Sequence, residues 1–261
     1  MKELKDYSGE FIPNLRYEDL SKDIIIKLLV EAGRTLTAIG GFWYTNICEK
    51  FGSDEGNRHH LDVWIKEADF CMPNIAKAAG IQVTDVASCM KAFQLDPAFN
   101  RDLFRVTIDI KARDRCLFTI HNCPSLAYQE REGKGREKFT CQVLEPATMI
   151  RYFGAFGIDV EPLPLKVPPR IGWQKKGWVD IACQWEFQQV PRKAYRGKIA
   201  DSREEQLDRL IEISWQIHEL AMSTSKGSRA EPGAGLDRMR TERRALLERL
   251  KWRSSRAQLP E

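Results

Sequence analysis

The sequence predicts an α+β protein, in which an N-terminal helical part packs on a small antiparallel sheet with short helices and is followed by a C-terminal helical hairpin. Three observations lead to this fold class. Apolar residues recur at helical spacing up to about residue 93, alternate with polar residues over 104–123, and return to helical spacing after residue 200. Helices, then strands, then helices is the order typical of α+β chains. We expect three parts, covering residues 1–100, 101–190 and 191–261.

In the N-terminal part, the sequence predicts an irregular arm followed by three helices. Apolar residues at helical spacing predict one long helix over about residues 20–51, with a weak point at the adjacent glycines 40 and 41. The second helix contains Pro73, which is expected to kink or restart it, and it ends near Gly80. Thr84 is the expected cap of the third helix.

The middle part predicts the sheet. Alternation over residues 103–123 indicates an antiparallel hairpin, and a short helix over 125–132 follows it. Pro146 is expected in the first turn of a helix over 147–156, where proline is tolerated. The prolines of segment 159–169 restrict it to an edge strand, and residues 179–187 alternate as a final strand.

In the C-terminal part, residues 191–261, the sequence predicts two long helices, over about 201–223 and 236–253, with a flexible linker over 225–235. Residues 191–261 have a net charge of +5, whereas residues 1–190 have a net charge of −1. The first tail helix has an apolar stripe that needs a partner. We expect homo-oligomer formation or binding of a partner protein through these helices. Nucleic acid is the less favoured partner, because acidic residues are interspersed with the arginines.

Composition excludes several classes of protein. With 43% hydrophobic and 30% charged residues, the chain is neither collagen-like nor wholly disordered. Its longest uncharged stretch, residues 35–48, is too short and too polar to span a bilayer. The first residues lack the apolar core of a signal peptide, so we expect a cytoplasmic protein without a membrane segment.

Seven cysteines, an odd number, without an export signal indicate reduced thiols. Four of them lie among apolar residues and are expected to pack in the core: Cys48, Cys71, Cys89 and Cys116.

The most informative segment contains His121 and Cys123 at the end of the predicted hairpin. Residues two apart on a strand share a face, so both side chains are expected to point the same way. Cys141 lies before the next helix and Cys183 on the last strand, and these segments can converge. Three thiolates and an imidazole suit zinc, and three thiolates suit an iron–sulfur cluster with one open iron. The spacing does not distinguish zinc from an iron–sulfur cluster, and it equally allows three separate buried thiols.

Glu145 is the acidic residue best placed to act beside these cysteines. It follows Cys141 by four residues, so it could serve as a general base for an activated water. A carboxylate that complements the N-terminus of the following helix explains its position equally well.

Several scattered motifs together resemble a known group of proteins. They are the arm 5–11, the Gly41-Phe-Trp-Tyr segment, the run from His121-Asn-Cys-Pro through Cys141 and Glu145, and Cys183-Gln-Trp-Glu-Phe. Over residues 1–190 the chain resembles uncharacterised cytosolic proteins of anaerobes that are similar to the amino-thiazoline-carboxylate hydrolase family and, more loosely, to vinyl-reductase-type small-molecule-binding domains. The resemblance implies a helical part on an α+β part and a site lined by Cys123, Cys141 and Cys183. Residues 191–261 match nothing in that group.

These observations predict a cytosolic enzyme, hydrolytic or cluster-dependent, that acts on a small sulfur- or nitrogen-containing compound. Cys123, Cys141 and Cys183 are the expected metal ligands, and His121 and Glu145 the expected catalytic groups. Two alternatives stay open. One is a non-catalytic sensor or accessory protein with structural zinc and a small-molecule ligand, and the other is an interaction protein that uses its basic tail helices.

Overall fold

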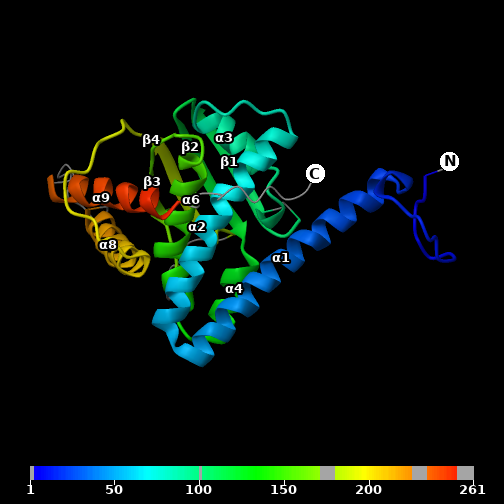
Figure 1. Cartoon of the computed structure of the whole chain (residues 1–261), viewed down its shortest axis with the longest axis horizontal. Coiled ribbons are helices and arrows are strands. Elements are labelled where there is room, and N and C mark those ends of the chain that lie inside the picture. The colour runs from blue at the N-terminus through cyan, green and yellow to red at the C-terminus, as the bar shows by residue number, and fades with distance from the viewer. Residues whose placement is uncertain (1–2, 100–101, 171–179, 225–233, 252–261) are drawn as a thin grey trace.

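A computed structural model describes the whole chain except residues 1–2, 100–101, 171–179, 225–233 and 252–261. It confirms the predicted α+β class, with a four-stranded antiparallel sheet and a C-terminal pair of helices. The N-terminal half contains α1 (Lys22–Phe51), α2 (Ser53–Ala78) and α3 (Val86–Phe93), with single 3-10 turns η1 (Tyr17–Asp19) and η2 (Pro97–Phe99). The first half of α1 projects away from the rest of the molecule and ends in the N-terminal arm (Figure 1).

A tight glycine turn reverses the chain between α1 and α2. Gly52 has φ of 92° and ends α1, which is a conformation that L side chains rarely adopt. Gly56 then lies against Cys48, and an added Cβ would overlap the Cys48 sulfur and lie 3.2 Å from its backbone nitrogen. The absence of a side chain at Gly56 is therefore what lets the two long helices approach at their junction.

The sheet has the strand order β1-β2-β4-β3, and every neighbouring pair is antiparallel. The predicted hairpin is present, and Pro162 and Pro164 lie in the edge strand β3, as expected. Large side chains of the two central strands, including Phe118, Trp185 and Phe187, are buried against the helices. The strands are β1 (Arg105–Ala112), β2 (Arg115–Asn122), β3 (Val160–Lys166) and β4 (Cys183–Gln189).

The expected helix over 147–156 begins about ten residues earlier, within a continuous helical run from 136 to 154. The run consists of α5 (Arg136–Phe139), a π-helical turn η3 (Thr140–Leu144) and α6 (Glu145–Gly154), and it follows α4 (Pro124–Glu132). In η3 the backbone N–H of Glu145 donates to the carbonyl of Thr140, five residues back. Pro146 has no N–H to donate, and in an ideal α-helix its ring would clash with the carbonyl four residues earlier. The wider turn explains why this proline does not end the helix.

The C-terminal helices α8 (Arg203–Thr224) and α9 (Ala234–Leu250) pack on each other and on the body of the same chain. The apolar stripe of α8 is buried there, with Leu210 and Ile213 fully inaccessible. The expectation of self-association through these helices rested on an unpartnered stripe, which the chain itself covers. Most of the expected linker over 225–235 lies outside the described residues.

One continuous cluster of buried hydrophobic residues includes members of all three expected parts, such as Leu61, Phe118 and Leu210. Within the described residues, none of the helices is both long and apolar enough to cross a membrane.

A buried ion cluster joins α9 to the edge strand β3. The Glu161 carboxylate forms ion pairs with three guanidinium groups, those of Arg240 at 2.9 Å, Arg243 at 2.8 Å and Arg244 at 3.1 Å. Glu161 and Arg243 have side-chain exposures of only 6% and 3%, so the charges depend on one another rather than on water.

Candidate functional site

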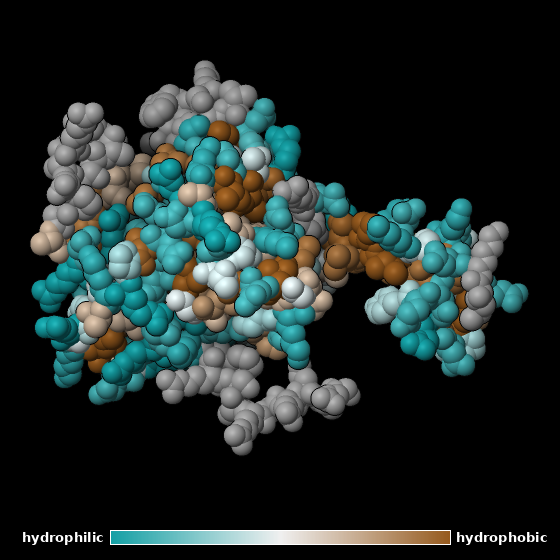
Figure 2. Space-filling view, turned by 90° about the horizontal axis from the view of Figure 1, so that it is seen from above, coloured by the Kyte–Doolittle hydropathy of each residue, from teal (hydrophilic) through white to brown (hydrophobic). Residues whose placement is uncertain are grey.

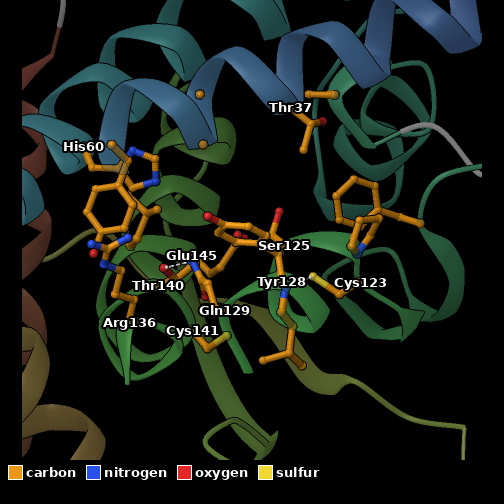
Figure 3. Close-up of a pocket in the computed structure, with 18 of the residues that line it drawn as sticks. Thr37, His60, Cys123, Ser125, Tyr128, Gln129, Arg136, Thr140, Cys141 and Glu145 are labelled. Carbon is orange, nitrogen blue, oxygen red and sulfur yellow. Dashed lines mark hydrogen bonds between the residues drawn. The ribbon is translucent and has the colours of Figure 1, made fainter. Parts of the chain in front are cut away.

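A cavity of about 360 Å³ lies between α1, α2, the ends of β2 and β4, and the helical segments α4 to α6. Its wall is mostly apolar, with contributions from Ile120, Leu126, Leu144 and Trp185. The polar and sulfur-containing side chains that line it are Arg34, Thr37, Tyr44, Thr45, His60, Cys123, Ser125, Tyr128, Gln129, Glu132, Arg136, Thr140, Cys141, Glu145 and Cys183. Figure 3 shows ten of the lining residues labelled, on both sides of this space.

The structure brings Cys123, Cys141 and Cys183 to this one cavity, although they are far apart in the sequence. Cys123 is the N-cap of α4, and its sulfur accepts a hydrogen bond from the backbone N–H of Leu126 at 3.3 Å. Cys141 lies in the π turn η3, and Cys183 is the first residue of β4. Three kinds of local structure, a helix cap, a wide helical turn and a strand start, therefore supply the three thiols.

The three thiols are buried and influence one another. Burial raises the pKa of Cys123 to about 12, and it raises the pKa values of Cys141 and Cys183 well above the ordinary thiol range. A thiolate at Cys183 or Cys123 raises the pKa of Cys141 further, so the groups lie within electrostatic reach of each other. Burial outweighs the opposing effect of the Arg170 guanidinium on Cys123 and Cys183, so all three thiols are protonated at neutral pH.

The spacing of the thiols does not match a ready-made site for a single ion. Among the described residues, the one group of three such ligand atoms within 4.8 Å of one another is Glu67, Cys71 and Asp96. The three sulfurs of the cavity are therefore not all within 4.8 Å of one another. A tetrahedral zinc ion with bonds of about 2.3 Å to sulfur would need them closer together.

Glu145 faces the same cavity from the first position of α6. Burial alone raises its pKa to about 7, and no hydrogen bond or ion pair from the described residues opposes this shift. A carboxyl group that is half protonated near neutral pH and lines a largely apolar cavity is suited to proton transfer.

His121 does not join the cavity, so the expected common orientation of His121 and Cys123 is wrong. Its Nε2 lies 2.8 Å from the hydroxyl of Thr107 on β1, and its Nδ1 lies 2.8 Å from the carbonyl of Asp180. Strand parity fails because β2 ends at Asn122 and Cys123 already caps α4. Ile120, on the opposite face of the strand from His121, is the β2 residue that lines the cavity.

The two long helices supply a wall that the sequence did not predict. The rings of Tyr44 on α1 and His60 on α2 are stacked, with centroids 4.4 Å apart. Burial lowers the pKa of His60 to about 4, so this ring is neutral at pH 7. The guanidinium of Arg136 lies 5.5 Å from the centroid of the Tyr44 ring and is held by the Glu132 carboxylate at 3.1 Å. The Gly41-Phe-Trp-Tyr segment was the one sequence signal near this wall.

The remaining cysteines lie outside this cavity. Cys48, Cys89 and Cys116 are buried, as expected, and Cys71 is half-buried; no disulfide joins any of the seven. Cys71 belongs to the close group with Glu67 and Asp96. The hydroxyl of Tyr152 lies 2.9 Å from Glu67 and 3.3 Å from Asp96, so this group already has an internal donor.

Comparisons with protein-family models, with curated proteins and with solved structures found no match to this chain.

Proposed function

We propose that this chain is an enzyme that acts on a small sulfur- or nitrogen-containing compound, with a metal centre bound by Cys123, Cys141 and Cys183. The observation that carries the proposal is the convergence on one cavity of three thiols and a carboxyl group for which the described residues supply no partner. Three separate segments, the cap of α4, the helical run 136–154 and the start of β4, must be folded correctly to bring these groups together. Cysteines that served only as core residues would not need to share a cavity wall.

The size and polarity of the cavity limit the substrate. A volume of about 360 Å³ is at the small end of ligand pockets, which span roughly 300–1,000 Å³. The wall is mostly apolar, and the aromatic rings of Tyr44, His60 and Trp64 lie on the helical side. These properties support a compact, largely uncharged compound rather than a nucleotide or a peptide.

The donor set favours a soft metal, and its spacing favours a cluster. Thiolates suit zinc, copper(I) and iron–sulfur centres. In a cluster the thiolates bind different iron atoms, so they stand farther apart than the ligands of one ion. The sulfurs here are too widely spaced for a single tetrahedral zinc, which also weakens the alternative of a structural zinc site in a sensor. A cluster with three cysteine ligands would leave one iron free to bind substrate sulfur or nitrogen.

Glu145 is the proposed proton carrier. With a pKa of about 7 it holds a proton about half the time at neutral pH. It therefore can accept a proton from a water or thiol bound in the cavity, and return it to the nitrogen or sulfur that leaves. His121 has no role in this proposal, because its ring is engaged outside the cavity. A hydrolysis of the amino-thiazoline-carboxylate type is one reaction consistent with these groups.

The test is metal and acid-labile sulfide analysis of protein purified without oxygen. Iron and sulfide should be present in the wild-type chain and fall at least tenfold in Cys123→Ser, Cys141→Ser and Cys183→Ser. Retention of the metal in all three variants, or its absence from the wild type, would contradict the proposal. Zinc at one per chain that depends on the same cysteines would support the sensor alternative instead.

Two control variants keep the result specific. Cys89→Ala removes a buried thiol that does not line the cavity, so it should retain the iron. Cys71→Ser alters the close group with Glu67 and Asp96. If this variant loses the metal and the cavity variants keep it, the metal belongs to that group and not to the cavity. Circular dichroism of each variant separates loss of metal from loss of fold.

A further inference from the structure

The projecting helix α1 presents an apolar face that the described part of the chain does not cover. Eight large apolar side chains between Ile25 and Trp43 have exposures from 40% to 73%. Figure 2 shows a brown, apolar band on the projecting part of the molecule, between the body and the N-terminal arm. Together the eight side chains expose on the order of several hundred Å², which is at the upper limit for monomeric proteins. The eight are Ile25, Ile26, Leu28, Leu29, Leu36, Ile39, Phe42 and Trp43.

Part of this face has the spacing of a coiled-coil seam. Positions separated alternately by four and three residues form a heptad pattern over almost three heptads. All of its members are exposed, and they lie on a different side of α1 from Thr37 and Tyr44, which line the cavity. We name these residues the α1 seam: Ile25, Leu29, Ala32, Leu36, Ile39 and Trp43.

We infer that the α1 seam is the dimer interface of this protein, where it packs antiparallel against the same seam of a second copy. The support is self-complementarity of shape. With the two-fold axis at residue 34, the small Ala32 of one copy lies opposite Leu36 of the other, and Leu29 lies opposite Ile39. Such pairs of a and d positions are what an antiparallel coiled coil requires, and in the Ala32–Leu36 pair a large side chain lies opposite a small one.

The position of the body favours the antiparallel arrangement over the parallel one. The seam spans 18 residues from Ile25 to Trp43, or about 27 Å of helix. Its C-terminal half runs along the body, and its N-terminal half projects from it (Figure 1). In an antiparallel pair the two bodies lie at opposite ends of the paired helices. The projecting N-terminal half of each α1 then packs against the C-terminal half of the α1 seam of the other copy. Parallel pairing would instead put Trp43 against Trp43 and leave both projecting halves at one end.

The area is sufficient for a stable dimer. A standard interface buries about 800 Å² from each partner. The eight exposed apolar side chains of α1 supply on the order of several hundred Å² of this area, and the N-terminal arm adds Phe11 at 82% and Tyr17 at 74% exposure. Another side of α1 lines the cavity, so one helix would serve both the interface and the site.

The test measures mass by light scattering after sizing chromatography, from about 5 to 100 μM. We expect the full chain at twice its 30.1 kDa mass. Leu29→Lys and Ile39→Glu should each lower the mass to that of one chain, because each places an unpaired charge in the apolar seam. The double variant L29K/I39E should restore the dimer, since antiparallel pairing puts the lysine introduced at position 29 of one copy opposite the glutamate introduced at position 39 of the other.

Several outcomes would overturn the inference. One is a wild type that is monomeric over the whole concentration range. Another is a double variant that stays monomeric, as both single variants are, so that pairing of the two introduced charges does not restore the dimer. Lys27→Glu is the matched control, because Lys27 is exposed on the side of α1 opposite the seam and its replacement should leave the dimer intact. If the wild type is monomeric and binds lipid vesicles in a manner that Leu29→Lys abolishes, the helix covers its seam on a lipid surface instead. All these substitutions are at exposed positions, and circular dichroism verifies that the fold is kept.

Discussion

Replacement of Glu145 by glutamine should stabilise the metal-free protein, and the effect should depend on pH. Burial raises the folded-state pKa of this carboxyl from an ordinary 4.5 to about 7. Below about pH 4.5 both the folded and the unfolded chain hold the proton, so wild type and E145Q should differ little. Between about pH 4.5 and 7 only the unfolded chain releases it, so the wild type loses stability as the pH rises. Above pH 7 the loss is complete.

The size of the effect follows from the shift in pKa. At 1.36 kcal/mol per pKa unit, the shift corresponds to about 3 kcal/mol. E145Q cannot ionise, so its free energy of unfolding should exceed that of the wild type by up to about this amount at pH 8. The group faces a cavity rather than bulk water, and nothing in the described structure pairs with it, so little screening reduces the value.

Urea denaturation of the chelator-treated protein, followed by circular dichroism from pH 4.5 to 8.5, measures the difference directly. Other groups also titrate in this range, since burial raises the pKa of Glu67 to about 7 as well. Subtraction of the wild-type curve from that of E145Q removes their contribution. Glu219→Gln, at an exposed position on α8, is the control for the removal of a carboxylate away from the cavity. A difference for E145Q that is constant from pH 4.5 to 8.5 would refute the reasoning about Glu145.

Three further predictions concern the core and the thiols. Glu161→Gln should lower the free energy of unfolding by about 3–5 kcal/mol, because it leaves buried guanidinium groups such as that of Arg243 without their carboxylate; urea denaturation at pH 7 measures this, and a loss below about 1 kcal/mol would contradict it. Leu210→Ala should cost about 2–5 kcal/mol and lower a single unfolding transition, because α8 shares its core with the body; a separate, early transition of the tail would disprove that unity. In metal-free protein Cys123 should resist iodoacetamide at pH 8, since burial raises the pKa of its thiol to about 12; mass spectrometry after digestion would reveal rapid labelling if this is wrong.

Local patterns predicted most of the fold. The alternation in residues 103–123 predicted the β1–β2 hairpin, and the prolines of β3 predicted its edge position. The hairpin follows from the alternation of polar and apolar residues, and the edge position follows from the backbone N–H that proline lacks. Both signals can be seen in short stretches of the sequence. The helix over 136–154 was predicted too short, because Pro146 is usually a helix start and only a wide turn lets it lie inside.

The site was predictable only in part. Sequence spacing suggested that Cys123, Cys141 and Cys183 could converge, but it misplaced His121 because strand parity was extended one residue beyond the end of β2. The wall formed by Tyr44 and His60 depends on how α1 and α2 pack across the helical run 136–154. Such contacts join residues far apart in the chain, and no local pattern specifies them.

The π turn relates the number of residues in the helical run 136–154 to the direction in which its side chains face the cavity. Each residue of an ideal α-helix advances by about 100°, so Arg136 and Glu145, nine residues apart, would point in opposite directions. The wide turn over Thr140–Leu144 winds more slowly and brings both toward the same space. An ideal α-helix with one residue fewer between them would advance by about 800°, which leaves the two side chains about 80° apart, so the π turn accommodates one extra residue without turning Arg136 away from Glu145. A protein that lacks one residue of this turn would therefore keep both its helix and the shared wall.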